Sequence, residues 1–241
     1  MTESSRRPTG DSPENADRIV RPLLVLGALG PWVYVLALVV GPLLWTSYSS
    51  YGESVSTLTS RGAPNQAVIG PLFALYNVAL IAFAVASRRV LPRRPRAAVG
   101  PAALAGAGAL GLLLFLFPQD PWGAPVTAVG EGHIAISGLL AFLFLVGLFG
   151  FWRTTAGSPG WAWFSRGTVA FFVAGIALGA FGAVSVTTPY AGLAERASIG
   201  TFLLWTELAS LALLAMVSRP SRFVQEAPVG PLDARVDVAA P

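Results

Sequence analysis

Residues 117–133 read FPQDPWGAPVTAVGEGH, a short polar stretch between two long apolar runs. The stretch contains Asp120 and Glu131, and it ends on the only histidine of the chain, His133. The apolar runs on either side, at about 98–117 and 131–152, each have roughly the 20 residues that a helix needs to cross a hydrocarbon core of about 30 Å. The pattern predicts a loop at one membrane surface between two transmembrane helices.

The same alternation of apolar runs and polar stretches extends to both ends of the chain. Hydrophobic residues make up 54% of the sequence and charged residues 12%, whereas about a quarter of the residues of a soluble domain are charged. Mean hydropathy is +0.64. We expect an all-α polytopic membrane protein, a bundle of six transmembrane helices over residues 21–218, between disordered tails at 1–20 and 219–241. The predicted spans are about 23–46, 67–87, 98–117, 131–152, 167–187 and 196–217.

The basic residues are distributed unequally between the two ends of the predicted helices. All sixteen are arginines, and only Arg61 and Arg196 fall on the side of residues 117–133. Because positive charge accumulates in cytoplasmic loops, we predict that both termini are cytoplasmic and that the protein lies in the plasma membrane. The same distribution explains the net charge of +4 without a nucleic-acid partner.

Small residues recur at intervals of four in two of the predicted spans. They are Ala103, Ala107 and Gly111 in the third span and Gly175, Gly179 and Ala183 in the fifth. Such spacing lets helix backbones approach closely in lipid. We interpret both stripes as packing surfaces within the bundle, and a homo-oligomer interface remains open.

Polar side chains gather on the side that is predicted to face outward. The candidate ligand-binding residues are Ser54, Ser56, Asp120, Glu131, His133 and Arg196. We predict that they form a shallow polar pocket that binds a lipid or small molecule, or through which a solute moves. The expected partners are therefore membrane lipids and a small molecule. No cofactor is indicated, because the chain has no cysteine and one histidine, which excludes a thiolate or multi-imidazole metal site.

A membrane-embedded hydrolase is the alternative. Ser54 or Ser56 would be the nucleophile, His133 the base and Asp120 the carboxylate that orients it. No strained nucleophile motif surrounds either serine, so no catalytic residue is assigned. In a purely structural interpretation, His133 caps a helix or bonds a neighbouring loop and Asp120 stabilises a turn between prolines.

A cation site is a further hypothesis, because Asp120, Glu131, Glu195 and His133 offer oxygen and nitrogen ligands. Glu131 and His133 are two residues apart, about 200° around a helix, and therefore do not share a face. That spacing counts against a metal site.

Three polar residues are predicted to lie near the middle of the membrane. Glu207 is eleven residues beyond Arg196, roughly 16 Å deeper by helix rise, and Tyr34 and Asn77 fall at similar depth. A carboxyl group inside a membrane is costly and suggests a function. We hypothesise a Tyr34–Asn77–Glu207 cluster, which either holds helices together or forms a proton or ligand pathway.

A series of short motifs occurs in a fixed order along the chain. They are Ser54-Val55-Ser56-Thr57-Leu58, Asn77, Phe117-Pro118-Gln119-Asp120-Pro121, Gly132-His133 and Glu195-Arg196. Over about residues 23–217 the chain resembles the bacterial six-span membrane family catalogued as domain of unknown function 998. The resemblance implies a six-helix fold and membrane residence, and no activity. The family often has Ser-Glu-Leu at Ser56-Thr57-Leu58, a departure that weakens any role for a carboxylate at position 57.

Overall fold

The computed structural model describes residues 13–218, and residues 1–12 and 219–241 lie outside the description. The described chain is helical and contains no strand, as predicted. Its helices are α1 (Pro13–Leu44), α2 (Gln66–Val90), α3 (Val99–Leu113), α4 (Ala128–Thr155), α5 (Ala162–Val184) and α6 (Ala191–Val217). Two short 3₁₀ helices, η1 (Val55–Thr59) and η2 (Leu114–Leu116), lie in the connections.

All six α-helices provide a segment long and apolar enough to cross a membrane. In α1 this segment is Arg18–Leu44, and α3 reaches sufficient length together with η2, as Val99–Leu116. The protein is therefore a multi-pass membrane protein with an all-α bundle, which confirms the predicted fold class.

The first helix begins earlier than the apolar run that predicts it. Helix α1 begins at Pro13, within the stretch 1–20 that we expected to be a disordered tail. Proline is favoured at the first position of a helix because the N–H that it lacks would have no partner there, so polar residues can extend the helix beyond its apolar part. The remainder of that tail, 1–12, and the predicted tail at 219–241 lie outside the described residues.

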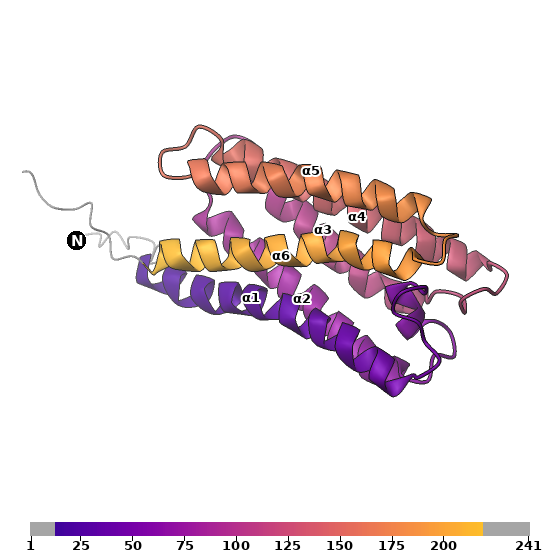
Figure 1. The fold of residues 1–241 in the computed structure, drawn as a ribbon. Helices are drawn as coiled ribbons and strands as arrows, with labels where there is room; N and C mark the ends of the chain where they lie inside the picture. Colours follow the sequence, from indigo (N-terminus) through magenta and orange to yellow (C-terminus); the bar gives the residue numbers. More distant parts are fainter. Residues whose placement is uncertain (1–12, 219–241) are drawn as a thin grey trace, which may run out of the picture.

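The helices form a closed ring in the order of the sequence. Each helix packs against the next, and α6 closes the ring by packing against α1 (Figure 1). The start of α1 and the end of α6 lie at the same end of the bundle, which we call the terminal face. The opposite end, formed by residues 45–65, 114–127 and 185–190, is the cavity face.

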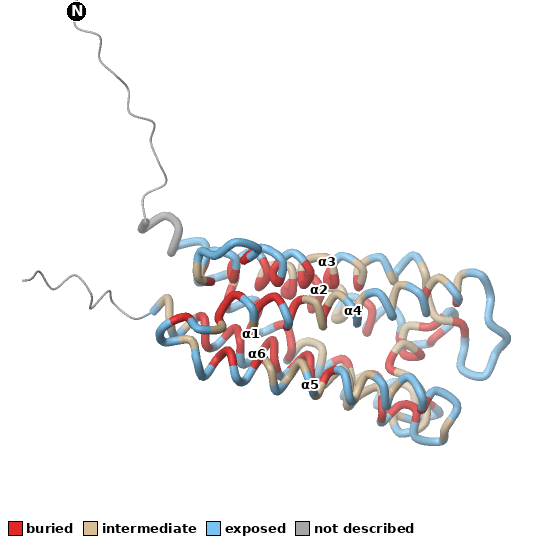
Figure 2. The backbone as a smooth tube through the Cα atoms, turned by 90° about the horizontal axis from the view of Figure 1, so that it is seen from above, coloured by how far each residue is buried: buried red, intermediate tan, exposed pale blue. Residues whose placement is uncertain are grey.

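An aromatic core fills the half of the bundle toward the terminal face. Trp205 of α6 lies edge-on to Phe83 of α2 and Phe151 of α4, with ring centroids 6.0 and 5.0 Å apart. The indole N–H of Trp205 donates a hydrogen bond to the Thr168 hydroxyl of α5 at 3.3 Å. Trp205 of α6 therefore contacts three other helices, α2, α4 and α5. The buried residues in Figure 2 concentrate along the bundle axis.

Small residues allow the closest helix contacts, as the spacing predicts. Ala103, Ala107 and Gly111 of α3 are all buried, and Gly111 lies against the side-chain amide of Asn77 of α2. Of the stripe in α5 only Gly175 is buried, between α4 and α6. The packing interpretation thus holds for the whole stripe of α3, but the outer part of the α5 stripe lines a cavity instead.

Candidate functional site: a cavity within the bundle

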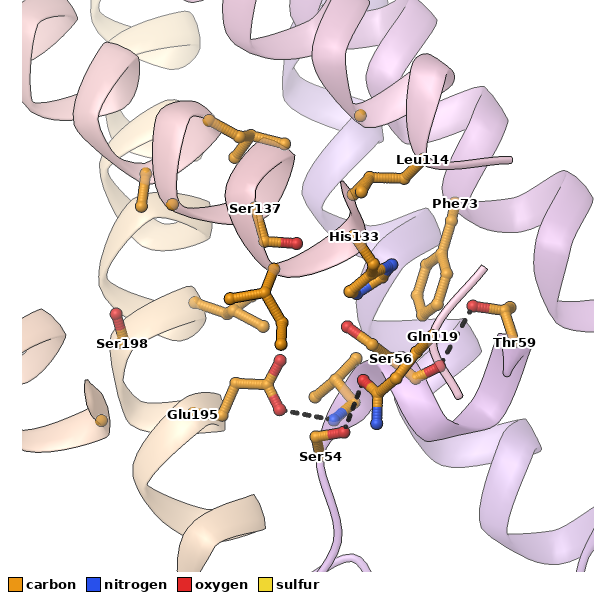
Figure 3. A pocket seen from close by; sticks show the side chains of 18 of the residues that line it. Ser54, Ser56, Thr59, Phe73, Leu114, Gln119, His133, Ser137, Glu195 and Ser198 are labelled. Carbon is orange, nitrogen blue, oxygen red and sulfur yellow. Dashed lines mark hydrogen bonds between the residues drawn. The ribbon is translucent and has the colours of Figure 1, made fainter. Parts of the chain in front are cut away.

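A cavity of about 660 Å³ occupies the half of the bundle toward the cavity face (Figure 3). All six helices contribute to its wall, together with η1, η2 and the loop after η2. The deep part is apolar and aromatic, with Leu80 and Phe144 among its residues, whereas Ser54, Glu195 and His133 lie near the mouth. The predicted shallow pocket is thus a deep cavity with one polar end, because the helices diverge beyond the aromatic core.

The polar end of the cavity is shaped by η1, which enters the bundle mouth. Val55 and Leu58 of η1 are buried, and Leu58 packs on Gly41 of α1. The Ser54 hydroxyl donates to Gln119 Oε1 at 3.0 Å, and Gln119 Nε2 donates to Thr57 Oγ1 at 3.3 Å. The hydroxyl-rich loop and the loop after α3 are therefore joined across the mouth by one amide side chain.

Glu195 presents a carboxylate to this cavity from the second turn of α6. The Val55 N–H donates to its Oε2 at 2.6 Å. Its other oxygen, Oε1, accepts no hydrogen bond from the described residues, and Figure 3 shows the carboxylate directed toward the cavity. No salt bridge to Glu195 occurs in the part of the chain that the structure describes, where Arg61–Asp120 is the one ion pair.

His133 lies on the opposite wall, in the second turn of α4. Its Nδ1 is 2.8 Å from the carbonyl oxygen of Phe117, which can only accept a hydrogen bond. In the neutral imidazole Nδ1 therefore carries the hydrogen, and Nε2 is left as an acceptor. The ring is held by the loop before α4, as the purely structural interpretation predicts, and it also lines the cavity.

Asp120 does not line the cavity but fixes the start of α4. Thr127 donates to its carboxylate twice, from the backbone N–H to Oδ2 at 2.7 Å and from the hydroxyl to Oδ1 at 2.9 Å. The same hydroxyl accepts from the Gly130 N–H at 3.3 Å and so caps the helix. The Thr127 hydrogen bonds, with the Arg61 guanidinium 3.9 Å away, lower the pKa of Asp120.

We expect Asp120 to make the stability of the protein depend on pH in the acid range. A carboxyl group with a lowered pKa in the folded state stabilises the fold above its unfolded pKa of about 3.9, and this contribution is lost as pH falls through the folded-state pKa. Asp120→Asn should therefore melt below the wild type at pH 7, and the difference should shrink below about pH 4. A constant difference in melting temperature across this range would contradict the assignment.

The hydrolase arrangement is not assembled in the described residues. Among these residues no hydrogen bond joins Ser56 to His133 or His133 to Asp120. Instead His133, the hypothesised base, bonds Phe117, and Asp120, the carboxylate that would orient it, bonds Thr127. Nor does any group of three or more His, Cys, Asp or Glu residues among positions 13–218 lie where it could hold a metal ion. The cation site hypothesised from the sequence therefore has no geometric support.

Arg196 also points away from the cavity, although it directly follows Glu195. Its Nη1 donates to the carbonyl oxygens of Glu53 and Gly192, at 3.2 and 3.0 Å, and its Nη2 donates to the Tyr48 hydroxyl. Burial raises the pKa of Tyr48, so its hydroxyl is neutral at physiological pH and can accept from the guanidinium. Arg196 thus holds the loop before η1 against α6.

The remaining predicted ligand residue, Glu131, is exposed and does not line the cavity.

The predicted intramembrane cluster is only partly assembled. Tyr34 and Asn77 both line the deep part of the cavity, where the Tyr34 ring packs on Phe73 with centroids 4.6 Å apart. The Asn77 amide donates to the Phe73 carbonyl at 2.8 Å. Glu207 is not on the cavity wall, and its buried Oε2 has no hydrogen-bond partner among the described residues. No hydrogen bond links the three predicted members.

Ser137 and Ser198 are further polar wall residues that were absent from the predicted set. A sequence signal for them exists, because Ser137 is four residues after His133 and Ser198 three after Glu195. Those spacings place each serine on the same helix face as the residue before it. Both hydroxyls are without a hydrogen-bond partner in the described chain and lie near the cavity in Figure 3.

Exposed residues of α4 and α5 are part of the cavity wall. At Gly175 the two helices are in contact, since a methyl group there would lie 3.1 Å from Leu145 of α4. Nearer the cavity face both helices line the cavity with exposed residues, including Ile134, which is 62% exposed. A methyl group added at Gly138 of α4 would have no neighbouring atom within 4 Å. Side chains of α4 and α5 thus fill less space next to the cavity face than they do at Gly175.

Fold and site together define a class of protein, a six-helix integral membrane protein with an amphipathic cavity in one half of its bundle. The chain belongs to the family described as Protein of unknown function (DUF998), which it matches over residues 28–212, in agreement with the resemblance of its motifs. Neither the curated proteins nor the solved structures contain a match to it.

Proposed function

We propose that this protein binds an amphiphilic lipid in the cavity, with the polar group of the lipid near Glu195 and His133 and its chain in the apolar interior. The observation that carries the proposal is the set of exposed cavity-lining residues on α4 and α5, including Ile134, together with the free space at Gly138. We infer from them a lateral opening between α4 and α5 that connects an apolar cavity with a polar end to the surroundings of the helices. A cavity of about 660 Å³ is within the usual range of ligand sites, about 300–1,000 Å³. A water-soluble ligand would need no such side entrance.

Binding without chemical turnover is the form of the proposal that the site supports. Catalysis by Ser56 would require a base within hydrogen-bond reach, whereas no hydrogen bond joins Ser56 to His133 in the described residues, and Asp120 is bonded to Thr127 rather than to His133. The hydroxyl groups on the wall then serve as hydrogen-bond partners for a bound polar group.

We further infer that the cavity face is outward and that the terminal face is cytoplasmic, in the plasma membrane. Within the described residues, Arg61 and Arg196 are the arginines at the cavity face, while the α2–α3 connection at the other end holds Arg93, Arg94 and Arg96. This charge difference follows the positive-inside rule. The lipid would accordingly come from the outer leaflet.

Filling the lateral opening tests the proposal. We expect Gly138→Phe to reduce the amount of lipid bound at least about tenfold, because the ring would enter the opening, a loss of about 1.4 kcal/mol in binding. Gly200→Phe is the matched control, since Gly200 of α6 also has open space around it and does not line the cavity. Native mass spectrometry after incubation with a membrane-lipid extract measures the bound lipid. A wild type without bound lipid, or equal retention by the two variants, would overturn the proposal.

A further inference from the structure

The charged side chain on the cavity wall is acidic. Within residues 13–218, Glu195 is the only acidic residue on the wall, and no arginine lines it. The two arginines at the cavity face are engaged elsewhere, Arg196 by the loop before η1 and Arg61 by Asp120 at 3.9 Å. A ligand in the cavity therefore meets one carboxyl group that forms no salt bridge with a basic side chain of the described residues.

Two hydrogen-bonding groups at the polar end of the cavity are acceptors. Glu195 Oε1 is an acceptor without a partner, and neutral His133 presents Nε2, also an acceptor, because its Nδ1–H is used by Phe117. The side-chain amide nitrogen of Gln119 carries two donor hydrogens, and it donates one of them to the Thr57 hydroxyl. The serine hydroxyls can donate or accept, and therefore do not reverse this preference.

Charge and hydrogen bonding thus select the polar group of the ligand. A phosphate or carboxylate would lie near the Glu195 carboxylate with no arginine or lysine to pair with it, which is unfavourable in a site of low dielectric constant. An ammonium group has the opposite charge and three N–H donors, so it can donate hydrogen bonds to acceptors such as Glu195 and His133. The apolar wall beneath them, including Leu80 and Phe144, fits a hydrocarbon chain.

From this arrangement we propose that the cavity selects a single-chain amphiphile whose polar group is a protonated amine, held by Glu195 and His133. The proposal rests on the proposed lipid-binding function and adds the chemical class of the ligand. It assigns Glu195, rather than the acidic residues of the surrounding loops, as the residue that determines charge preference.

Three analogues that share one dodecyl chain test the assignment: dodecylammonium, dodecanol and dodecanesulfonate. Their binding to the protein in nanodiscs of zwitterionic lipid is measured by calorimetry at neutral pH, with empty nanodiscs as the blank. We expect dodecylammonium to bind at least about tenfold more tightly than dodecanesulfonate, with dodecanol between them. Glu195→Gln should remove this preference by weakening dodecylammonium about tenfold, equivalent to about 1.4 kcal/mol.

The choice of variants separates charge from structure. Glutamine keeps an oxygen that can accept the Val55 N–H, so the fold at η1 is preserved. Glu131→Gln is the control, because it removes an exposed acid of α4 that does not line the cavity, and it should keep the full preference. Equal binding of the three analogues, or an ammonium preference that persists in Glu195→Gln, would overturn the inference and leave lipid binding intact. Absence of binding by all three would overturn both.

Discussion

Replacing Gly150 by alanine is expected to prevent the bundle from forming its native α3–α4 contact. A methyl group on Gly150 would lie 2.5 Å from the backbone nitrogen of Gly100 and 2.6 Å from its Cα. Backbone atoms cannot turn aside as a flexible side chain can, so the two helices would have to move apart. Overpacking costs about 1–3 kcal/mol and occasionally more, and we expect about 3 kcal/mol or more here.

The same helix supplies the control for this prediction. Gly138→Ala adds the same methyl group to α4 at a position with no atom within 4 Å, and replacing glycine by alanine favours a helix. Thermal unfolding of the two detergent-solubilised variants should give a large loss of melting temperature for Gly150→Ala and no loss for Gly138→Ala. Similar melting temperatures would show that α3 and α4 do not meet at Gly100 and Gly150.

Removing the Arg196 side chain is expected to release the loop before η1 from α6. Its guanidinium bonds Glu53, Gly192 and Tyr48, and it stacks on the Tyr48 ring with the carbon of the guanidinium 5.6 Å from the centroid. Hydrogen bonds to charged groups contribute about 1.5–3 kcal/mol each. Because Arg196 is partly exposed, we expect Arg196→Ala to lower the free energy of unfolding by about 2–3 kcal/mol in total.

Hydrogen exchange localises this effect. In Arg196→Ala the amide of Leu193, which donates to the Tyr51 carbonyl at 3.0 Å, should exchange at least about tenfold faster, equivalent to about 1.4 kcal/mol. Arg61→Ala is the comparison, since the Arg61 side chain is 52% exposed and exposed ion pairs contribute little, about 0–1 kcal/mol. If the two variants protected Leu193 equally, the loop would be held by other contacts.

The helices could be predicted from the sequence because hydrophobic length alone determines whether a segment spans a membrane. Their ends were less predictable: α4 begins at Ala128 rather than near residue 131 because Thr127 caps it while bonded to Asp120. That interaction joins two parts of a loop, and no apolar periodicity reports it.

The cavity residues were predicted in part, for a geometric reason. Sequence position places Ser54, Ser56 and His133 at the correct end of the bundle, and all three line the cavity. Position does not give direction: consecutive helix residues point about 100° apart, so Glu195 faces the cavity while Arg196 faces the loop. Glu207 shows the same limit, since similar depth did not place it beside Tyr34 and Asn77.

The aromatic core around Trp205 gives the molecule a permanent asymmetry across the membrane. Phe83, Phe151 and Trp205 close the bundle axis beneath the cavity, and both the mouth and the lateral opening lie on the other side of that barrier. The aromatic core forms the floor of the cavity, so a lipid bound as we propose would exchange with one leaflet only. Carrying a molecule to the opposite leaflet would require these rings to part.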